Sequence, residues 1–181
     1  MIYRNVVSAV VRALAAETIS SAGGCDFEPK VQCAKQKGEI VGKEAAFLTD
    51  CWVFGRLHKS LSAEHWRVLV AKFSTHSERK HVAIAELTRV VQSPAPERFL
   101  HCAVVTWALP RLPGVDGKRS TNVLPSGWYE MDNWSNVPHP IKTQERWRRE
   151  IRKVLEREVD EALVSAQALL DAEGLIGTQA A

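Results

Sequence analysis

The sequence predicts an all-α protein: a helical bundle with one long loop and a long amphipathic C-terminal helix. Apolar residues recur at spacings of three and four through most of the chain, and no run alternates convincingly between polar and apolar residues as a strand does. Proline and glycine gather in two stretches, 21–42 and 110–141, that separate the helical segments. At 181 residues with 45% hydrophobic residues, the chain can form one domain with a sizeable core.

Three helices are expected in the first part of the chain. The first covers residues 2–20 and has an apolar side, and the second covers 43–59 and is apolar nearly all round, which is typical of a central buried helix. Ser62 is a good N-cap for a third helix, in which Trp66, Leu69, Val70 and Phe73 share one face.

Two more helices are expected before the long loop. The fourth covers residues 77–92. Ser93 and Pro94 supply an N-cap and a first-turn proline for a fifth helix, which stops before Pro110.

The last helix is expected over residues 143–173, a stretch without proline or glycine that ends at Gly174. One apolar stripe recurs along it at helical spacing and is expected to be buried. Its members are Ile151, Leu155, Val159, Ala162, Leu163, Ala166, Leu169 and Leu170. This stripe can pack on the protein's own core or on a second copy, so a homodimer stays possible.

The charges of this last helix oppose its dipole. Residues 142–157 carry seven bases and three acids, whereas residues 158–173 carry five acids and no base. A helix dipole favours acids in the first turn and bases in the last, by roughly 0.3–1 kcal/mol for each charge. The bases therefore indicate an anionic partner, most simply nucleic acid, or else only a solvated face. Trp147, among the arginines, either stacks on a partner or lies in the core, and its place on the apolar stripe favours the core.

Residues 110–141 form a loop far longer than the usual ~4–6 residues, and they contain five prolines and three glycines. Trp128, Tyr129 and Trp134 lie within it, and pure linkers rarely contain such aromatic residues. We expect an ordered loop that is held against the core and displays Lys118 and Arg119. A packed extension whose tryptophans fill core gaps is an equal alternative.

The sequence does not favour catalysis, a metal or a cofactor. The nearest ligand pairs are Cys25 with Cys33 and His76 with His81, and neither pair has the spacing of a structural zinc motif. Cys51 lies in an apolar helix, where a core thiol is the better interpretation. No phosphate-binding, dinucleotide-binding or nucleophile-elbow motif is present in the sequence. A membrane span and a signal peptide are not expected either, so we expect a cytoplasmic protein with reduced thiols.

Residues 61–109 are compatible with a helix-turn-helix arrangement. The segment Leu61–Phe73 resembles the support helix of sigma-factor region 4, and Ile84-Ala85-Glu86-Leu87 resembles the first helix of a helix-turn-helix. A plain helical hairpin fits the same residues. With the arginine-rich last helix, this centre resembles late-gene antiterminators of the Q type from phages and prophages. That resemblance implies a small helical protein that binds a promoter-proximal DNA element and RNA polymerase.

The sequence therefore predicts a non-enzymatic transcription regulator with a helical core (1–109), a long loop (110–141) and a C-terminal helix (142–181). The rival hypothesis is a phage-type factor that inhibits a host protein without nucleic acid and uses the aromatic residues Trp128, Tyr129 and Trp134. The candidate nucleic-acid contacts are Arg79, Lys80, Arg98, Lys118, Arg119, Arg146, Arg148, Arg149, Arg152 and Lys153.

Overall fold

The computed structural model describes residues 2–21, 43–111 and 124–176, and over these ranges the protein is all-α. A single isolated β-bridge, between Tyr3 and Ile176, is the one β-type pairing in these ranges. The elements are α1 (Val6–Ser21), α2 (Lys43–Ser60), α3 (Ala63–Phe73), α4 (Ser77–Val90), α5 (Glu97–Ala108), the 3₁₀ turns η1 (Ser126–Tyr129) and η2 (Met131–Trp134), and α6 (Ile141–Ala172). The prediction of an all-α fold with a long C-terminal helix is confirmed.

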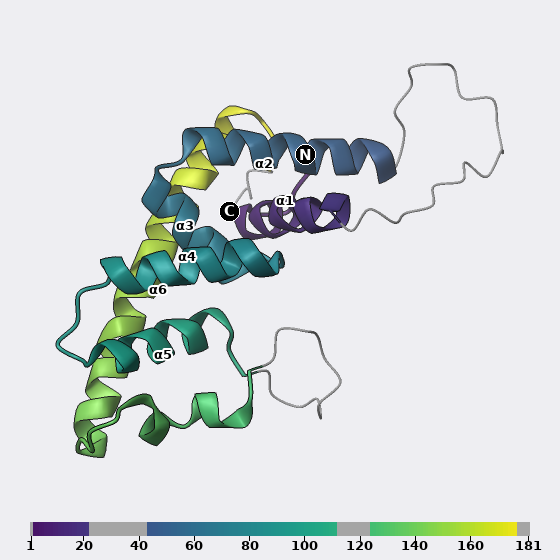
Figure 1. The fold of residues 1–181 in the computed structure, drawn as a ribbon. Coiled ribbons are helices and arrows are strands. Elements are labelled where there is room, and N and C mark those ends of the chain that lie inside the picture. The colour runs from purple at the N-terminus through teal and green to yellow at the C-terminus, as the bar shows by residue number, and fades with distance from the viewer. Residues whose placement is uncertain (1, 22–42, 112–123, 177–181) are drawn as a thin grey trace, which may run out of the picture.

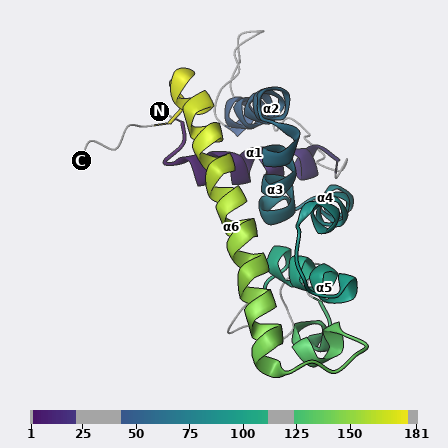
Figure 2. The ribbon, with the colours of Figure 1, turned by 90° about the vertical axis from the view of Figure 1, so that its left-hand side faces the viewer.

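The 32-residue helix α6 runs the length of the molecule and organises it (Figure 1). Helices α1 and α2 lie at its C-terminal end, α3 packs against its middle, and α5 with the two 3₁₀ turns lies at its N-terminal end (Figure 2). Helix α4 packs on α3 and α5. The apolar stripe expected from the sequence is the face that α6 buries, because Ile151, Leu155, Val159, Ala162, Ala166 and Leu170 are all buried.

Helix α6 ends as the sequence predicts. Gly174 has a positive φ of 67°, a conformation that glycine adopts without steric cost. The N–H of Gly174 donates to the carbonyl of Asp171 (3.0 Å), and that of Leu175 donates to the carbonyl of Leu170 (3.0 Å). These two bonds form a Schellman motif, which satisfies carbonyls that the helix end would leave unpaired.

The segment after this cap is tied to the N-terminal segment. The carbonyl of Leu175 accepts hydrogen bonds from the N–H groups of Ile2 and Tyr3, both at 3.2 Å. The hydroxyl of Tyr3 donates to Asp50 Oδ1 on α2 (2.6 Å), and Arg12 on α1 pairs with Asp50 Oδ2 (3.0 Å). Asp50 is buried, so these two partners offset the cost of removing its carboxylate from water.

Glu156 joins three helices near the middle of α6. Its Oε1 accepts hydrogen bonds from Lys72 Nζ of α3 (3.1 Å) and from the indole Nε1 of Trp107 of α5 (3.0 Å). The Lys72 ammonium also lies 4.5 Å from the centre of the Trp107 ring. One carboxylate therefore fixes the positions of α3 and α5 on α6.

The central buried helix is α5 rather than α2, which corrects the expectation from the sequence. Nine of the twelve residues of α5 are buried. In α2, by contrast, Leu48 and Trp52 are each 48% exposed. Helix α2 lies at the periphery because only α1 packs extensively on it, so an apolar surface all round does not guarantee burial.

Helix α5 also begins later than expected, at Glu97. The hydroxyl of Ser93 accepts a hydrogen bond from the N–H of Ala95 and so stabilises a turn. A serine side chain can cap a local turn as well as a helix, which explains the shift. The other helix boundaries agree with the expected ones to within a few residues.

Aromatic packing closes the bundle at the N-terminal end of α6. The ring of Phe99, which is fully buried, meets Trp134 and Trp147 edge to face, with centroid separations of 5.1 and 5.5 Å. The indole Nε1 of Trp134 donates to the carbonyl of Trp128 (2.7 Å). Residues 124–140 therefore pack against the core, and Trp147 is a core residue as its spacing predicts. Over the described ranges, no helix is both long and apolar enough to cross a membrane.

The two tryptophans at positions 134 and 52 are expected to respond differently to truncation. Trp134 is 1% exposed, so Trp134→Ala should lower the free energy of unfolding by about 3–5 kcal/mol. Trp52 is 48% exposed, and Trp52→Ala should cost less than about 1 kcal/mol. Urea denaturation followed by circular dichroism measures both, and equal losses would contradict the placement of Trp134 in the core.

The bond between Tyr3 and Asp50 predicts a loss of stability in alkali. Burial, and then the hydrogen bond to Asp50, raise the pKa of Tyr3 above its ordinary value. The unfolded chain then releases this proton first, and stability falls as pH rises above about 10, by up to about 1.4 kcal/mol for each pH unit. The Tyr3→Phe variant should be less stable at neutral pH but should lack this part of the decline. Denaturation at pH 8 to 11 compares the two proteins, and parallel curves would contradict the assignment.

Candidate nucleic-acid interface

The structure sorts the bases of the first half of α6 into three groups. Arg152 and Arg157 are compensated by acids on the same helix: Arg152 Nε lies 3.7 Å from Glu156 Oε1, and Arg157 Nη2 lies 3.4 Å from Glu158 Oε1. Arg148 lies against the aromatic end of the core, with its guanidinium carbon 5.8 Å from the centre of the Trp134 ring. The remaining four bases, Lys142, Arg146, Arg149 and Lys153, have no carboxylate oxygen within 4.0 Å in the described chain.

These four exposed residues form a single line, here called the basic stripe, on the outer side of α6. Their spacing of four, three and four is the spacing of one helix face. Each lies two positions from a buried residue of the same helix, Gln144, Trp147 or Ile151, and two positions correspond to about 200° of rotation. The basic stripe therefore points away from the core.

Arg146, Arg149 and Lys153 are among the contacts predicted from the sequence, whereas Lys142 is not. The signal for Lys142 is in the sequence, since it continues the same spacing by one turn towards the N-terminus. At 1.5 Å per residue, the stripe from Lys142 to Lys153 is about 16 Å long.

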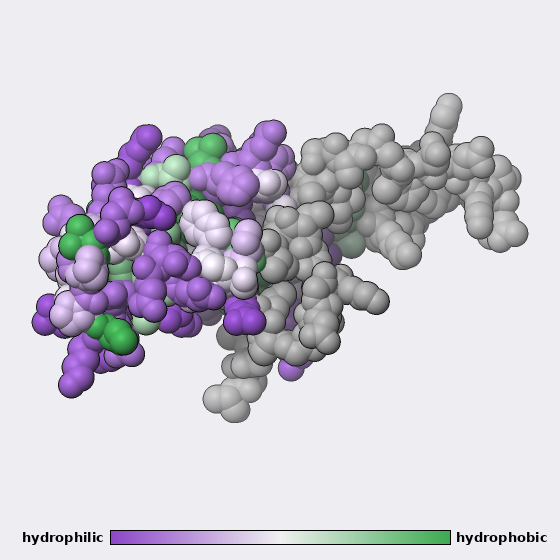
Figure 3. Space-filling view, turned by 60° about the horizontal axis from the view of Figure 1, so that its bottom comes forward, coloured by the Kyte–Doolittle hydropathy of each residue, from purple (hydrophilic) through white to green (hydrophobic). Residues whose placement is uncertain are grey.

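The surroundings of the basic stripe are polar. Glu145 and Glu150 are exposed on its two edges and form no ion pair within 4.0 Å in the described residues. Figure 3 shows the end of the molecule at which α6 begins, where hydrophilic side chains cover most of the described surface and hydrophobic ones are scattered. The electrostatic potential above the stripe is therefore set by its four cations and reduced by the two acids on its edges.

The basic residues at the start of α4 do not extend this surface. Lys80 is buried, with 8% exposure, and its Nζ lies 3.4 Å from the carbonyl oxygen of Lys72 and 3.3 Å from that of Ser74. Burial, and then the charge of Lys72, lower its pKa. The expectation that Lys80 contacts DNA is corrected: its ammonium caps the end of α3. Arg79 is exposed, and its guanidinium carbon lies 5.8 Å from the centre of the Phe54 ring.

Helix α5 is not arranged as a base-reading helix. Among its side chains only Glu97, Arg98 and His101 are exposed. Arg98 donates a hydrogen bond from Nη1 to Asn136 Oδ1 and so ties α5 to the segment before α6. A recognition helix must place several side chains in the major groove, which the buried α5 does not do. The arrangement of α4 and α5 therefore matches the plain helical hairpin.

The aromatic residues of the long loop are turned inward. Trp134 is a core residue, which corrects its expected role in binding a partner. Trp128 and Tyr129 are half-buried, and the Tyr129 hydroxyl donates to the carbonyl of Leu109 (2.9 Å). Lys118 and Arg119, the loop bases expected to contact nucleic acid, lie outside the described residues.

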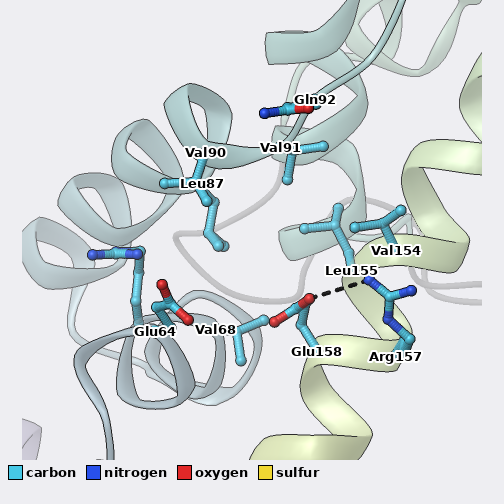
Figure 4. A pocket seen from close by; sticks show the side chains of 11 residues that line it. Glu64, Val68, Leu87, Val90, Val91, Gln92, Val154, Leu155, Arg157 and Glu158 are labelled. Atoms are coloured by element: carbon cyan, nitrogen blue, oxygen red, sulfur yellow. Dashed lines mark hydrogen bonds and ion pairs between the residues drawn. The ribbon is translucent and has the colours of Figure 1, made fainter.

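Three hollows lie elsewhere on the bundle, and one of about 330 Å³ lies between the start of α3 and the C-terminal part of α6, where Ser62, His65 and Leu169 line it. An open groove of about 850 Å³ between α2, α3 and α4 is lined by Phe54, His58 and Trp66, whose rings contact one another. The smallest cavity, of about 240 Å³, lies between α3, α4 and α6, where apolar side chains line it together with Glu64, Arg67, Gln92 and the Arg157–Glu158 pair (Figure 4). Its volume is below the ~300 Å³ at which small-molecule pockets usually begin.

The two cysteines of the described ranges are not activated thiols. Cys51 and Cys102 are free cysteines, and burial is the main cause that raises the pKa of each thiol, which makes it less nucleophilic. In the described ranges, no three His, Cys, Asp or Glu side chains are grouped so that they could hold a metal ion.

No protein-family model, no curated protein and no solved structure matches this chain. The assignment of the site therefore depends on its own geometry and charge.

Reversing the charge of Lys142 should stabilise the helix. Lys142 lies in the first turn of α6, which contains no acid. Lys142→Glu replaces an unfavourable charge with a favourable one and should raise the free energy of unfolding by about 0.5–1 kcal/mol. Arg149→Glu lies two turns further along, beyond the reach of the dipole, and is the matched control with little expected gain. Thermal denaturation of both variants checks the difference, and equal gains would contradict an origin in the helix terminus.

Proposed function

We propose that this protein is a non-enzymatic regulator that binds DNA, and that the basic stripe of α6 makes the contact with the phosphates. The observation that carries this proposal is the set of four exposed cations on one helix face without acid partners. Lys142, the stripe cation in the first turn of α6, lowers the stability of the helix. A cost of this kind is consistent with selection for an anionic ligand.

The stripe has the chemistry that phosphate binding needs. Lysine ammonium groups and arginine guanidinium groups neutralise phosphates, and the release of counterions then drives association. If each of the four cations neutralises one phosphate, the slope of log K against log salt on duplex DNA is about −3.6. Between 50 and 200 mM salt the affinity should then fall by roughly 100-fold.

The other end of the bundle supports the regulatory part of the proposal. Helices α1 and α2 lie at the end of α6 that is remote from the basic stripe (Figure 1). Exposed apolar side chains are present there, namely Val7 and Val11 on α1 and Leu48 and Trp52 on α2. A protein partner such as RNA polymerase could bind this end while DNA occupies the other. This arrangement agrees with the resemblance to Q-type antiterminators from phages and prophages.

A factor that binds and inhibits a host protein is the second candidate, and the groove between α2, α3 and α4 favours it. Its aromatic wall of Phe54, His58 and Trp66 is suited to receive apolar side chains of another protein. The two functions differ in salt dependence, because an interface held by aromatic anchors responds weakly to salt whereas phosphate-led binding responds steeply.

Removing three cations of the stripe should abolish most DNA binding. The triple variant Arg146→Ala, Arg149→Ala, Lys153→Ala leaves one stripe cation, so the salt slope should fall from about −3.6 to about −0.9. At 50 mM salt the affinity for a labelled 20-base-pair duplex of random sequence should fall more than 10-fold. Fluorescence anisotropy at several salt concentrations measures both quantities.

The matched control is Arg4→Ala, Lys59→Ala, Arg89→Ala, which removes three exposed bases that lie elsewhere. It lowers the net charge by the same amount and should keep the wild-type slope. If both triple variants lose affinity equally, net charge explains the binding and the assignment to the stripe is wrong. If the wild-type protein does not bind the duplex at 50 mM salt, the proposed function is wrong.

A further inference from the structure

We infer that the basic stripe is built for the backbone of an intact duplex and not for single-stranded nucleic acid. This inference rests on the proposed function and specifies its ligand. It follows from two features of the described residues: the position of the aromatic rings and the rigidity of the helix backbone that carries the cations.

Single-strand binders combine cations with aromatic rings on which unpaired bases stack. The aromatic residue within the stripe's own stretch of sequence, Trp147, is buried on the opposite side of α6. Its ring packs on Phe99 and on His139, with centroid separations of 5.5 and 5.0 Å. Trp134 is also buried, at 1% exposure. Within the described residues, α6 therefore offers no exposed ring beside its cations on which an unpaired base could stack.

Near the start of α6 the partly accessible aromatic side chains are Trp128 and Tyr129, and both are engaged: Trp128 packs on His101 of α5, and the Tyr129 hydroxyl donates to the carbonyl of Leu109. Among the Phe, Trp and Tyr residues of the described ranges, only Trp52 is exposed. It belongs to α2, which lies at the far end of the bundle. The groove rings Phe54 and Trp66 are half-buried and belong to α2 and α3. Unpaired bases could not reach them from the basic stripe without crossing the bundle.

The helix backbone that carries the stripe is also rigid. The four stripe residues lie on one helix whose inner face is held by Ile151 and Leu155, which are 2% and 0% exposed. A duplex presents its phosphates in fixed positions, so on contact only the lysine and arginine side chains of the stripe lose conformational freedom. A single strand is flexible and would have to be ordered along the helix without any stacking to offset the cost.

The acidic half of α6 limits the footprint. Asp160 and Asp171 are exposed and continue the helix face of the stripe beyond Lys153, and they repel phosphate. Contact is therefore confined to the ~16 Å of the stripe, less than half of the ~34 Å helical repeat of DNA. A short duplex should consequently be sufficient for one binding site.

The test compares three probes with the wild-type protein by fluorescence anisotropy at 50 mM salt. The probes are a 20-base-pair duplex of random sequence, a 12-base-pair duplex and single-stranded dT20. We expect the 20-base-pair duplex to bind at least 10-fold more tightly than dT20, and the 12-base-pair duplex to bind within about threefold of it. The exposed single variant Arg149→Ala should flatten the duplex salt slope by about 0.9. Circular dichroism verifies that this variant is folded.

The outcomes separate this inference from the proposed function. Binding of dT20 as tight as that of the duplex would overturn the inference and leave DNA binding in place. A requirement for more than 12 base pairs would overturn the confined footprint, and an unchanged salt slope for Arg149→Ala would place the contact elsewhere. Binding of none of the probes would overturn the inference and the proposed function together.

Discussion

The burial of one face of α6 is the constraint on which the rest of the structure depends. Helices α1, α3 and α5 all pack on this face. The apolar contacts are non-directional, so they do not by themselves fix how the helices are placed along α6. Glu156 adds that direction, because the hydrogen bonds from Lys72 and Trp107 to one oxygen have fixed geometry. The combination of an apolar face and one shared carboxylate gives the bundle a defined arrangement.

The sequence was sufficient to predict the helices and the buried face of α6, because spacing and caps are local signals. The Gly174 stop and the Ser62 cap are examples: the Ser62 hydroxyl accepts from the N–H of His65 at 3.2 Å. The sequence did not reveal which helix is central. The apolar residues of α2 are spread evenly around the helix, but burial requires neighbours on every side, and these surround α5, whose sequence is the more apolar of the two.

The candidate site could be predicted from the sequence only in part. The bases of α6 are visible in the sequence, but their compensation by acids depends on side-chain geometry. Arg152 is paired while Lys153, its neighbour, is not. The burial of Lys80 could not be predicted from its sequence neighbours, because a lysine in a polar cluster is normally on the surface. This lysine is buried because the end of α3 offers two carbonyl oxygens to its ammonium group. The inward turn of Trp134 likewise depends on Phe99, thirty-five residues earlier in the chain.

The length of α6 sets a fixed distance between the two ends of the molecule. At 1.5 Å per residue, its 32 residues span about 48 Å without a proline or glycine that would bend it. Anything held at the α1–α2 end would be kept at a fixed distance from a ligand on the basic stripe, and at a fixed rotation about the helix axis. If the proposed regulator binds two partners at once, α6 sets how far apart they stand and which of their faces meet.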